Sequence, residues 1–368
     1  MKTSRILSRS VATLIALSPI AAYSAADTLS GASPAWITAT AWSLGSIPGT
    51  GDNAILAATG TVDVRGSALG GFREIQDITF NATAALTLVN NSSSVAMILA
   101  LNGGRGAGVP LIATVGNFAY TITGPGTNAT PRALGLDLRA SGDISVAANI
   151  LAITSIITQT GAPQSINKTG AGRLVLGGAN TFSGGANVTG GVLEVTANGG
   201  LGTGPAVVNG GTLEINLAAA TLTTADIEVN AGGQIATRGT VTLNNSLTLN
   251  GGTLATRTTD GGTYAGALNV TADSFVNLRS YSTPANSQSI TISGLLSGSG
   301  SLTVNGNDPQ TNGLNKALIL TNPANTFSGA FHVSNNQILR NLPATTGKTI
   351  GSGLVNLNGG ALQLRDDG

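Results

Sequence analysis

Two glutamates, Glu194 and Glu214, stand 20 residues apart at the same place in a repeated phrase. Each follows a Gly-Gly pair and a leucine, in the phrases GGVLEV and GGTLEI. A close pair of carboxylates could work as general acid and nucleophile, as in glycoside hydrolysis. The same place in other copies holds Ala255 and Gln363, and no cluster of Arg, Lys or aromatic residues accompanies the pair. We therefore predict two solvated, outward-facing carboxylates about 5 Å apart, and no catalytic residue.

Other reactive groups are scarce in the chain. It has no cysteine and one histidine, His332, within a repeat-like strand, so we expect a structural role for that imidazole. No Gly-x-Ser-x-Gly elbow is present, and the usual ligand types for zinc are missing. The stretch from Gly347 to Thr349 reads GKT, but Leu342 stands where a phosphate-binding loop needs glycine. We expect no cofactor and no metal site.

The elements that must position these residues are set by a period near 20. Apolar residues that follow glycine-containing turns recur at intervals of 19, 20, 22 and 19 residues. They are Leu174, Leu193, Leu213, Ile235 and Leu254. Later examples keep the theme less regularly, at Leu302, Leu318, Ile338 and Leu362. Between the turns, alternation of apolar and polar residues predicts short strands, and nothing in the chain's later part has helical spacing.

Short strands, glycine-rich turns and this period favour an all-β fold, a right-handed parallel β-helix with about 20 residues per coil. The first five apolar residues of the series should form one interior column. Asn209, Asn250 and Asn358 are interpreted as turn residues that stack into side-chain ladders. An antiparallel sandwich with evenly spaced turns is the alternative.

Composition and the N-terminus indicate export. Only 9% of the 368 residues are charged, against 52 glycines. Lys2, Arg5 and Arg9 precede an apolar run and small residues, which predicts a signal peptide over 1–26. That run is too short for a permanent membrane span, so the mature chain should have none. Without these three basic residues the formal net charge of +1 falls to about −2, which gives no support for nucleic-acid binding.

The segment that follows differs from the repeats. Residues 27–60 contain both tryptophans, Trp36 and Trp42, and we expect them to cap the end of the β-helix, since an open end would expose apolar core. A carbohydrate-stacking platform is the alternative role for the tryptophans. Residues 61–165 are predicted to form degenerate coils, and 166–368 the regular ones.

One stretch carries a resemblance. From Lys168 to Val195, the sequence KTGAGRLVLGGANTFSGGANVTGGVLEV closely resembles the autotransporter-associated β-strand repeat. A second copy, from Ala317 to Asn336, is similar in its middle but has an extra proline, Pro323, and lacks the closing Gly-Gly pair. The resemblance implies a secreted, β-helical, passenger-type region of a bacterial surface protein. It transfers no catalytic residue.

Three functions fit this sequence. The first is a secreted or cell-surface structural and adhesive protein, not an enzyme, with surface glycans or other cells as partners. The second is a polysaccharide lyase or glycosidase built on a β-helix. The third is a stalk for a functional domain elsewhere. Because the chain ends just after another Gly-Gly-x-Leu phrase, we expect the β-helix to continue beyond Gly368 and the exposed end to self-associate.

Overall fold

The computed structural model describes twelve stretches of the chain. They are 26–30, 48–64, 71–92, 96–103, 108–124, 133–217, 219–257, 261–278, 289–305, 317–334, 337–342 and 350–364. Most of the expected signal peptide, Trp36, Trp42 and the GKT stretch lie outside the described residues, so the predictions on them stay predictions.

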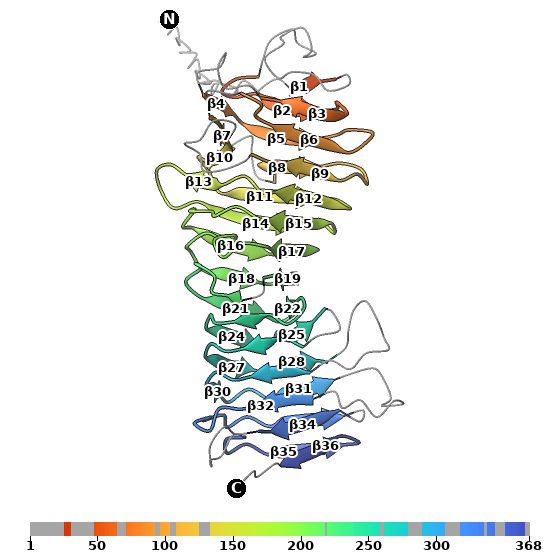
Figure 1. The fold of residues 1–368 in the computed structure, drawn as a ribbon, viewed down its shortest axis with the longest axis vertical. Coiled ribbons are helices and arrows are strands. Elements are labelled where there is room, and N and C mark those ends of the chain that lie inside the picture. The colour runs from red at the N-terminus through yellow and green to blue at the C-terminus, as the bar shows by residue number, and fades with distance from the viewer. Residues whose placement is uncertain are drawn as a thin grey trace, which may run out of the picture.

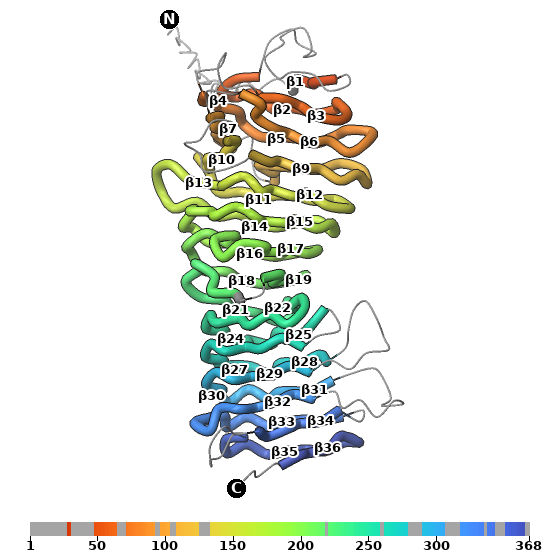
Figure 2. The backbone as a smooth tube through the Cα atoms, viewed as in Figure 1, coloured from red at the N-terminus to blue at the C-terminus, as the bar shows by residue number. Residues whose placement is uncertain are grey.

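The chain forms a parallel β-solenoid of about 11 turns, roughly 23 residues apart. Figure 1 shows an elongated rod, with β1 near one end and β36 at the other. The described residues contain strands and turns and no helix, so none of their helices could cross a membrane. The backbone trace in Figure 2 follows the same coil, turn after turn, along the rod. The predicted all-β solenoid is confirmed.

Each coil contributes one strand to each of two long sheets. The first sheet contains β1 (Ala26–Leu29), β2 (Asn53–Leu56), β5 (Asp77–Phe80), β8 (Ile112–Thr114), β11 (Gly142–Val146), β14 (Ser165–Thr169), β16 (Gly185–Val188), β18 (Ala206–Val208), β21 (Ile227–Asn230), β24 (Leu247–Asn250), β27 (Leu268–Ala272) and β30 (Leu296–Gly298). The second sheet contains β3 (Gly60–Asp63), β6 (Leu86–Val89), β9 (Tyr120–Ile122), β12 (Ile150–Ile153), β15 (Arg173–Leu176), β17 (Val192–Val195), β19 (Gly211–Ile215), β22 (Gly233–Thr237), β25 (Thr253–Thr256), β28 (Ser274–Asn277), β31 (Leu302–Asn305), β33 (Phe331–Ser334) and β35 (Val355–Asn358).

Two shorter sheets complete the coils. The four-stranded sheet contains β4 (Phe72–Ile75), β7 (Met97–Leu101), β10 (Leu134–Leu138) and β13 (Ile157–Gln159). The seven-stranded sheet contains β20 (Ala219–Ala220), β23 (Thr242–Leu243), β26 (Thr263–Tyr264), β29 (Ile290–Ile292), β32 (Ala317–Leu320), β34 (Ile338–Asn341) and β36 (Ala361–Leu364). Between β13 and β20, the coils have only their two long-sheet strands.

The predicted interior column exists. Leu174, Leu193, Leu213, Ile235 and Leu254 are neighbours in the parallel register of the second sheet, and all are fully buried. Because successive side chains of a strand point to opposite faces, placing this column inside places its neighbours in the sequence outside.

The later apolar residues do not continue that column. Its next members are Val276, Val304 and Val333. Leu302 lies in the same sheet but two residues earlier along its strand, opposite Ser274. Leu318, Ile338 and Leu362 belong to the seven-stranded sheet instead. The reason is coil length, because each later coil gains a third strand and longer connections, which shifts every downstream position.

The two-strand coils replace a third strand by a corner. Asn180 accepts a hydrogen bond from the amide of Ile157 at 2.8 Å and donates one to the carbonyl of Gly200 at 2.8 Å. Phe182, two residues later, is fully buried. The second copy of the repeat uses Asn325 and Phe327 in the same way. These residues satisfy buried backbone groups and fill the core where strand pairing stops.

The expected asparagine ladder is present at the turns of the first sheet. Asn230 donates to the side-chain oxygen of Asn209 at 2.8 Å, and Asn250 donates to that of Asn230 at 2.9 Å. Asn358 ends β35, opposite Ser334. Stacked amides of this kind join successive coils by side-chain bonds as well as backbone bonds.

Candidate functional site

The two glutamates lie side by side on the outer face of the second sheet. Glu194 is the register neighbour of Glu214, as the repeat period predicted. On either side of the pair, the same row holds Val175 and then Ala236 and Ala255. The row runs along the rod, from one coil to the next.

Arginines reach this row from both of its sides. Arg173 begins β15, one coil before Glu194 and two residues ahead of the row. Arg238 and Arg257 follow β22 and β25, and their amides extend the ladder to the carbonyls of Ile215 and Thr237 at 2.9 and 2.8 Å. Three guanidinium groups therefore converge on two carboxylates from four different coils.

The contacts form one connected group, which we call the Arg–Glu network: Arg173, Glu194, Glu214, Arg238 and Arg257. Nη1 of Arg173 lies 2.7 Å from Oε2 of Glu194 and 3.1 Å from Oε2 of Glu214. Arg257 also binds Oε2 of Glu214. Nη1 of Arg238 lies 3.1 Å from Oε1 of Glu194 and 3.8 Å from Oε1 of Glu214. Each carboxylate is thereby shared between arginines of different coils.

The predicted environment of the pair is wrong. Glu194 and Glu214 are 5% and 1% exposed, and the arginine cluster that we expected to be missing is present. The pair faces outward, as expected, but long arginine side chains lie against it and keep water away. An outward position in a strand is therefore not sufficient for solvation.

Charge and hydrogen bonding fix the ionised form of Glu194. Burial opposes ionisation, but the amide of Asn216, at 2.7 Å, and the guanidinium groups of Arg173 and Arg238 outweigh it and lower the pKa of this carboxyl. Glu194 is therefore ionised at neutral pH and accepts hydrogen bonds. With three arginines and two carboxylates, the Arg–Glu network carries a formal charge of +1.

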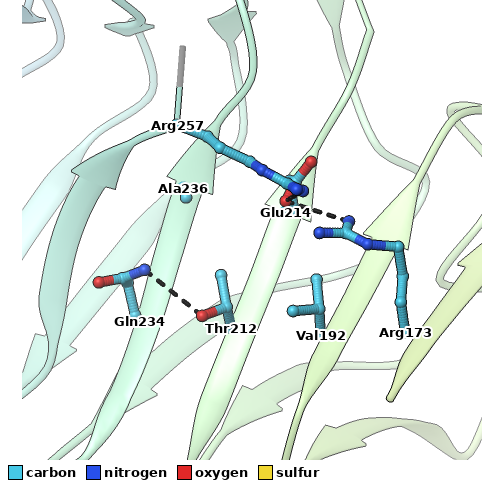
Figure 3. Close-up of a pocket in the computed structure, with 7 residues that line it drawn as sticks. All are labelled: Arg173, Val192, Thr212, Glu214, Gln234, Ala236 and Arg257. Carbon is cyan, nitrogen blue, oxygen red and sulfur yellow. Dashed lines mark hydrogen bonds and ion pairs between the residues drawn. The ribbon is translucent and has the colours of Figure 1, made fainter. Parts of the chain in front are cut away.

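A concavity of about 300 Å³ opens beside Glu214. Figure 3 shows Arg257 and Arg173 reaching Glu214 from opposite sides, above Gln234, Thr212 and Val192. Gln234 donates to the hydroxyl of Thr212 at 3.4 Å. Val192 and Ala236 supply an apolar part of the lining. The concavity thus combines cationic donors, one carboxylate, two neutral polar groups and a small apolar area.

The other predicted residues stand apart from this site. His332 lies on β33, with Nδ1 3.2 Å from Nδ2 of Asn356, and these rings and amides lie on later coils. In the part of the chain that the structure describes, no group of three or more His, Asp or Glu residues is placed to hold a metal ion.

Lys168 escaped the sequence reasoning altogether. It is fully buried, and its ammonium group donates to the carbonyls of Thr169, Gly170 and Gly190 at 2.7, 2.8 and 3.1 Å. Burial lowers its pKa to about 8, while the three carbonyls favour the charged form. Its inward position could have been found from the register, because it lies two residues after Ile166 on the same face.

Comparison with known families agrees with these features. Residues 166–195 and 317–335 match the family model of the passenger-associated transport repeat. Those two matches include both asparagine corners, at Asn180 and Asn325. No curated protein and no solved structure matches the chain. The resemblance found in the sequence is confirmed, and the repeat together with the β-solenoid fits an autotransporter passenger.

Proposed function

We propose that this solenoid, a carrier of passenger-associated transport repeats, is a structural and adhesive rod displayed at the bacterial cell surface or secreted, and not an enzyme. The observation that carries the proposal is the unbroken pairing of the two long sheets from coil to coil. Backbone ladders of this length hold a rod extended without disulfides, and a rod can present many weak contacts at once.

The outer face supports a distributed mode of contact. Asn187 donates to Asn167 at 3.0 Å, and Asn167 donates to Asp143 at 3.1 Å, so polar side chains run along the first sheet across three coils. Such amide and hydroxyl rows match the hydrogen-bonding groups of glycans, which we propose as partners. Export through the predicted signal peptide over 1–26 is part of the same proposal.

The state of the glutamate pair supports a non-catalytic role. A glycosidase needs one protonated carboxyl at its working pH, to protonate the leaving group. The pKa of Glu194 is lowered, and arginines occupy Glu194 and Glu214. Both groups are therefore committed to ion pairs that a general acid could not keep.

The proposal is tested by export and adhesion of the full chain. We expect the protein to reach the surface or the medium of a bacterial host, and a chain lacking 1–26 to remain inside the cells. Cells that display it should adhere to glycan-coated surfaces more than cells without it. An exported, folded rod that adheres to nothing would reject adhesion and favour the stalk function.

One observation favours the alternative of a polysaccharide-processing enzyme, namely the concavity beside Glu214. A screen of acidic and neutral polysaccharides for released sugars tests it. Turnover that is lost in both Glu194→Gln and Glu214→Gln, but not in Glu228→Gln, would establish catalysis and overturn the non-catalytic proposal.

A further inference from the structure

We infer that the concavity beside Glu214 binds the carboxylate-bearing sugar unit of an acidic glycan. The inference deepens the proposed adhesive function and rests on it, because it names a class of glycan and the place where it binds. The concavity spans strands β15 to β25, so a single bound unit would contact side chains from several coils.

The first argument is the charge that the Arg–Glu network leaves over. Its three guanidinium groups outnumber its two carboxylates, and two of the three, on Arg173 and Arg257, line the concavity. A bound anion would bring the formal charge from +1 to zero. In an enclosed setting, with side chains of Arg173 and Glu214 only 15% and 2% exposed, this neutralisation is stronger than at an open surface.

The second argument is the orientation of Arg173. Only its Nη1 takes part in the bonds to Glu194 and Glu214. Figure 3 shows its other terminal nitrogen directed over Val192, into the concavity. Among the described residues, that second nitrogen has no hydrogen-bond partner, and a guanidinium edge of this kind is suited to the two oxygens of a carboxylate.

The third argument selects a sugar among carboxylates. Thr212, Gln234 and Glu214 offer both donors and acceptors, as ring hydroxyl groups require. Val192 and Ala236 offer a small apolar area for the C–H face of a ring. A volume of about 300 Å³ lies at the lower end of small-ligand sites, which fits one sugar unit rather than a longer segment.

The test uses the full chain and trigalacturonate as the probe, with its methyl ester as the uncharged counterpart, by titration calorimetry at low salt. We expect binding of trigalacturonate and at least tenfold weaker binding of the ester. Arg173→Gln should weaken binding of the acid by about 10- to 100-fold, the loss of one charged hydrogen-bonded contact. The matched control is Arg139→Gln, which breaks another arginine–carboxylate pair, to Asp137 at 2.6 Å.

Because Arg173→Gln leaves both glutamates short of a partner, a second variant fills the concavity and spares its charges. Val192→Phe should abolish binding, whereas Ile150→Phe should not, since Ile150 lies in the same row, two coils earlier, outside the concavity. Circular dichroism and amide exchange verify that each variant is folded.

Unchanged binding by folded Val192→Phe would overturn the inference, and so would equal binding of acid and ester. Tighter binding of inorganic phosphate than of trigalacturonate would also reject a sugar carboxylate as the ligand. Adhesion of displaying cells separates the two proposals. Adhesion that persists without trigalacturonate binding rejects this site alone, and trigalacturonate binding without any adhesion rejects the adhesive function and retains the site.

Discussion

Removing the charge of Glu214 should loosen the coils around the Arg–Glu network. In Glu214→Gln, Arg173, at 3.1 Å, and Arg257 lose a shared carboxylate oxygen, and Arg238 loses an ion contact at 3.8 Å. Breaking a buried ion pair from one side costs about 3–5 kcal/mol. Arg238 and Arg257 keep 42% and 32% of their side-chain exposure, so water screens part of that cost. Glutamine also keeps one accepting oxygen, and we expect about 2 kcal/mol.

Native-state amide exchange is the suitable assay, because a long stacked solenoid need not unfold in one cooperative step. A loss of about 2 kcal/mol corresponds to exchange about 30-fold faster, and we expect it in β17, β19 and β22, whose strands carry the network. The control is Glu228→Gln on the first sheet, where the carboxylate contacts Asn250 at 3.5 Å. That variant should change exchange by less than about threefold, as an exposed polar contact does. Equal effects of the two variants would refute the argument that the network holds these coils together.

Three further perturbations test other parts of the structure. Leu213→Asp places an unpaired charge in the fully buried column, and we expect it to abolish exchange protection in the coils on either side, while Leu213→Ala should cost about 2–5 kcal/mol. Lys168 has a pKa near 8 when folded and near 10.5 when unfolded, so the unfolded chain binds more protons between these values. Stability relative to Lys168→Met should therefore rise from pH 8 to 10.5, by at most about 1.4 kcal/mol per pH unit, in denaturation at a series of pH values; a flat difference would contradict it. Gly191 has φ +62°, and an added Cβ would lie 2.4 Å from the carbonyl oxygen of Gly172, so Gly191→Ala should lower thermal stability more than Gly161→Ala, which has open space around it; equal melting points would show that the close approach is relieved without cost.

The core column could be predicted because it depends on two facts that the sequence carries. Glycine-rich turns mark where each coil begins, and alternation in the next four residues marks which side chain points inward. Between Leu174 and Leu254 the coil length varies only from 19 to 22 residues, so counting from the turns keeps the register. Beyond Leu254 the coils lengthen to 28 residues between Val276 and Val304, and counting fails.

The pairing of Glu194 with Glu214 could be predicted for the same reason, but their surroundings could not. Arg173 precedes its partner Glu194 by 21 residues and Arg257 follows its partner Glu214 by 43, so the network joins positions that are separated by unequal coils. A signal was available in the row three residues after the column, where Asn216, Arg238 and Arg257 follow one another. Its meaning depends on side-chain length, because only arginine can return from that row to the glutamates.

The place of the network in the rod gives it a structural reason as well. The coils of β15, β17 and β19 lie where the four-stranded sheet has ended and the seven-stranded sheet has not begun, so backbone ladders join them on two faces only. Their third side is held by single contacts such as the Asn180 corner. Arg173 binds backward from β15, and Arg238 and Arg257 bind from coils that have regained a third strand, so the network fastens the two-strand coils to the three-strand coils beyond them. Charged pairs that fit only one register favour one stacking of otherwise similar coils over its neighbours, which a column of interchangeable leucines cannot do. A bound carboxylate at Arg173 would act on this same junction, so ligand binding should slow amide exchange in β17 and β19 and leave β5 and β31, at the far ends of the rod, unchanged.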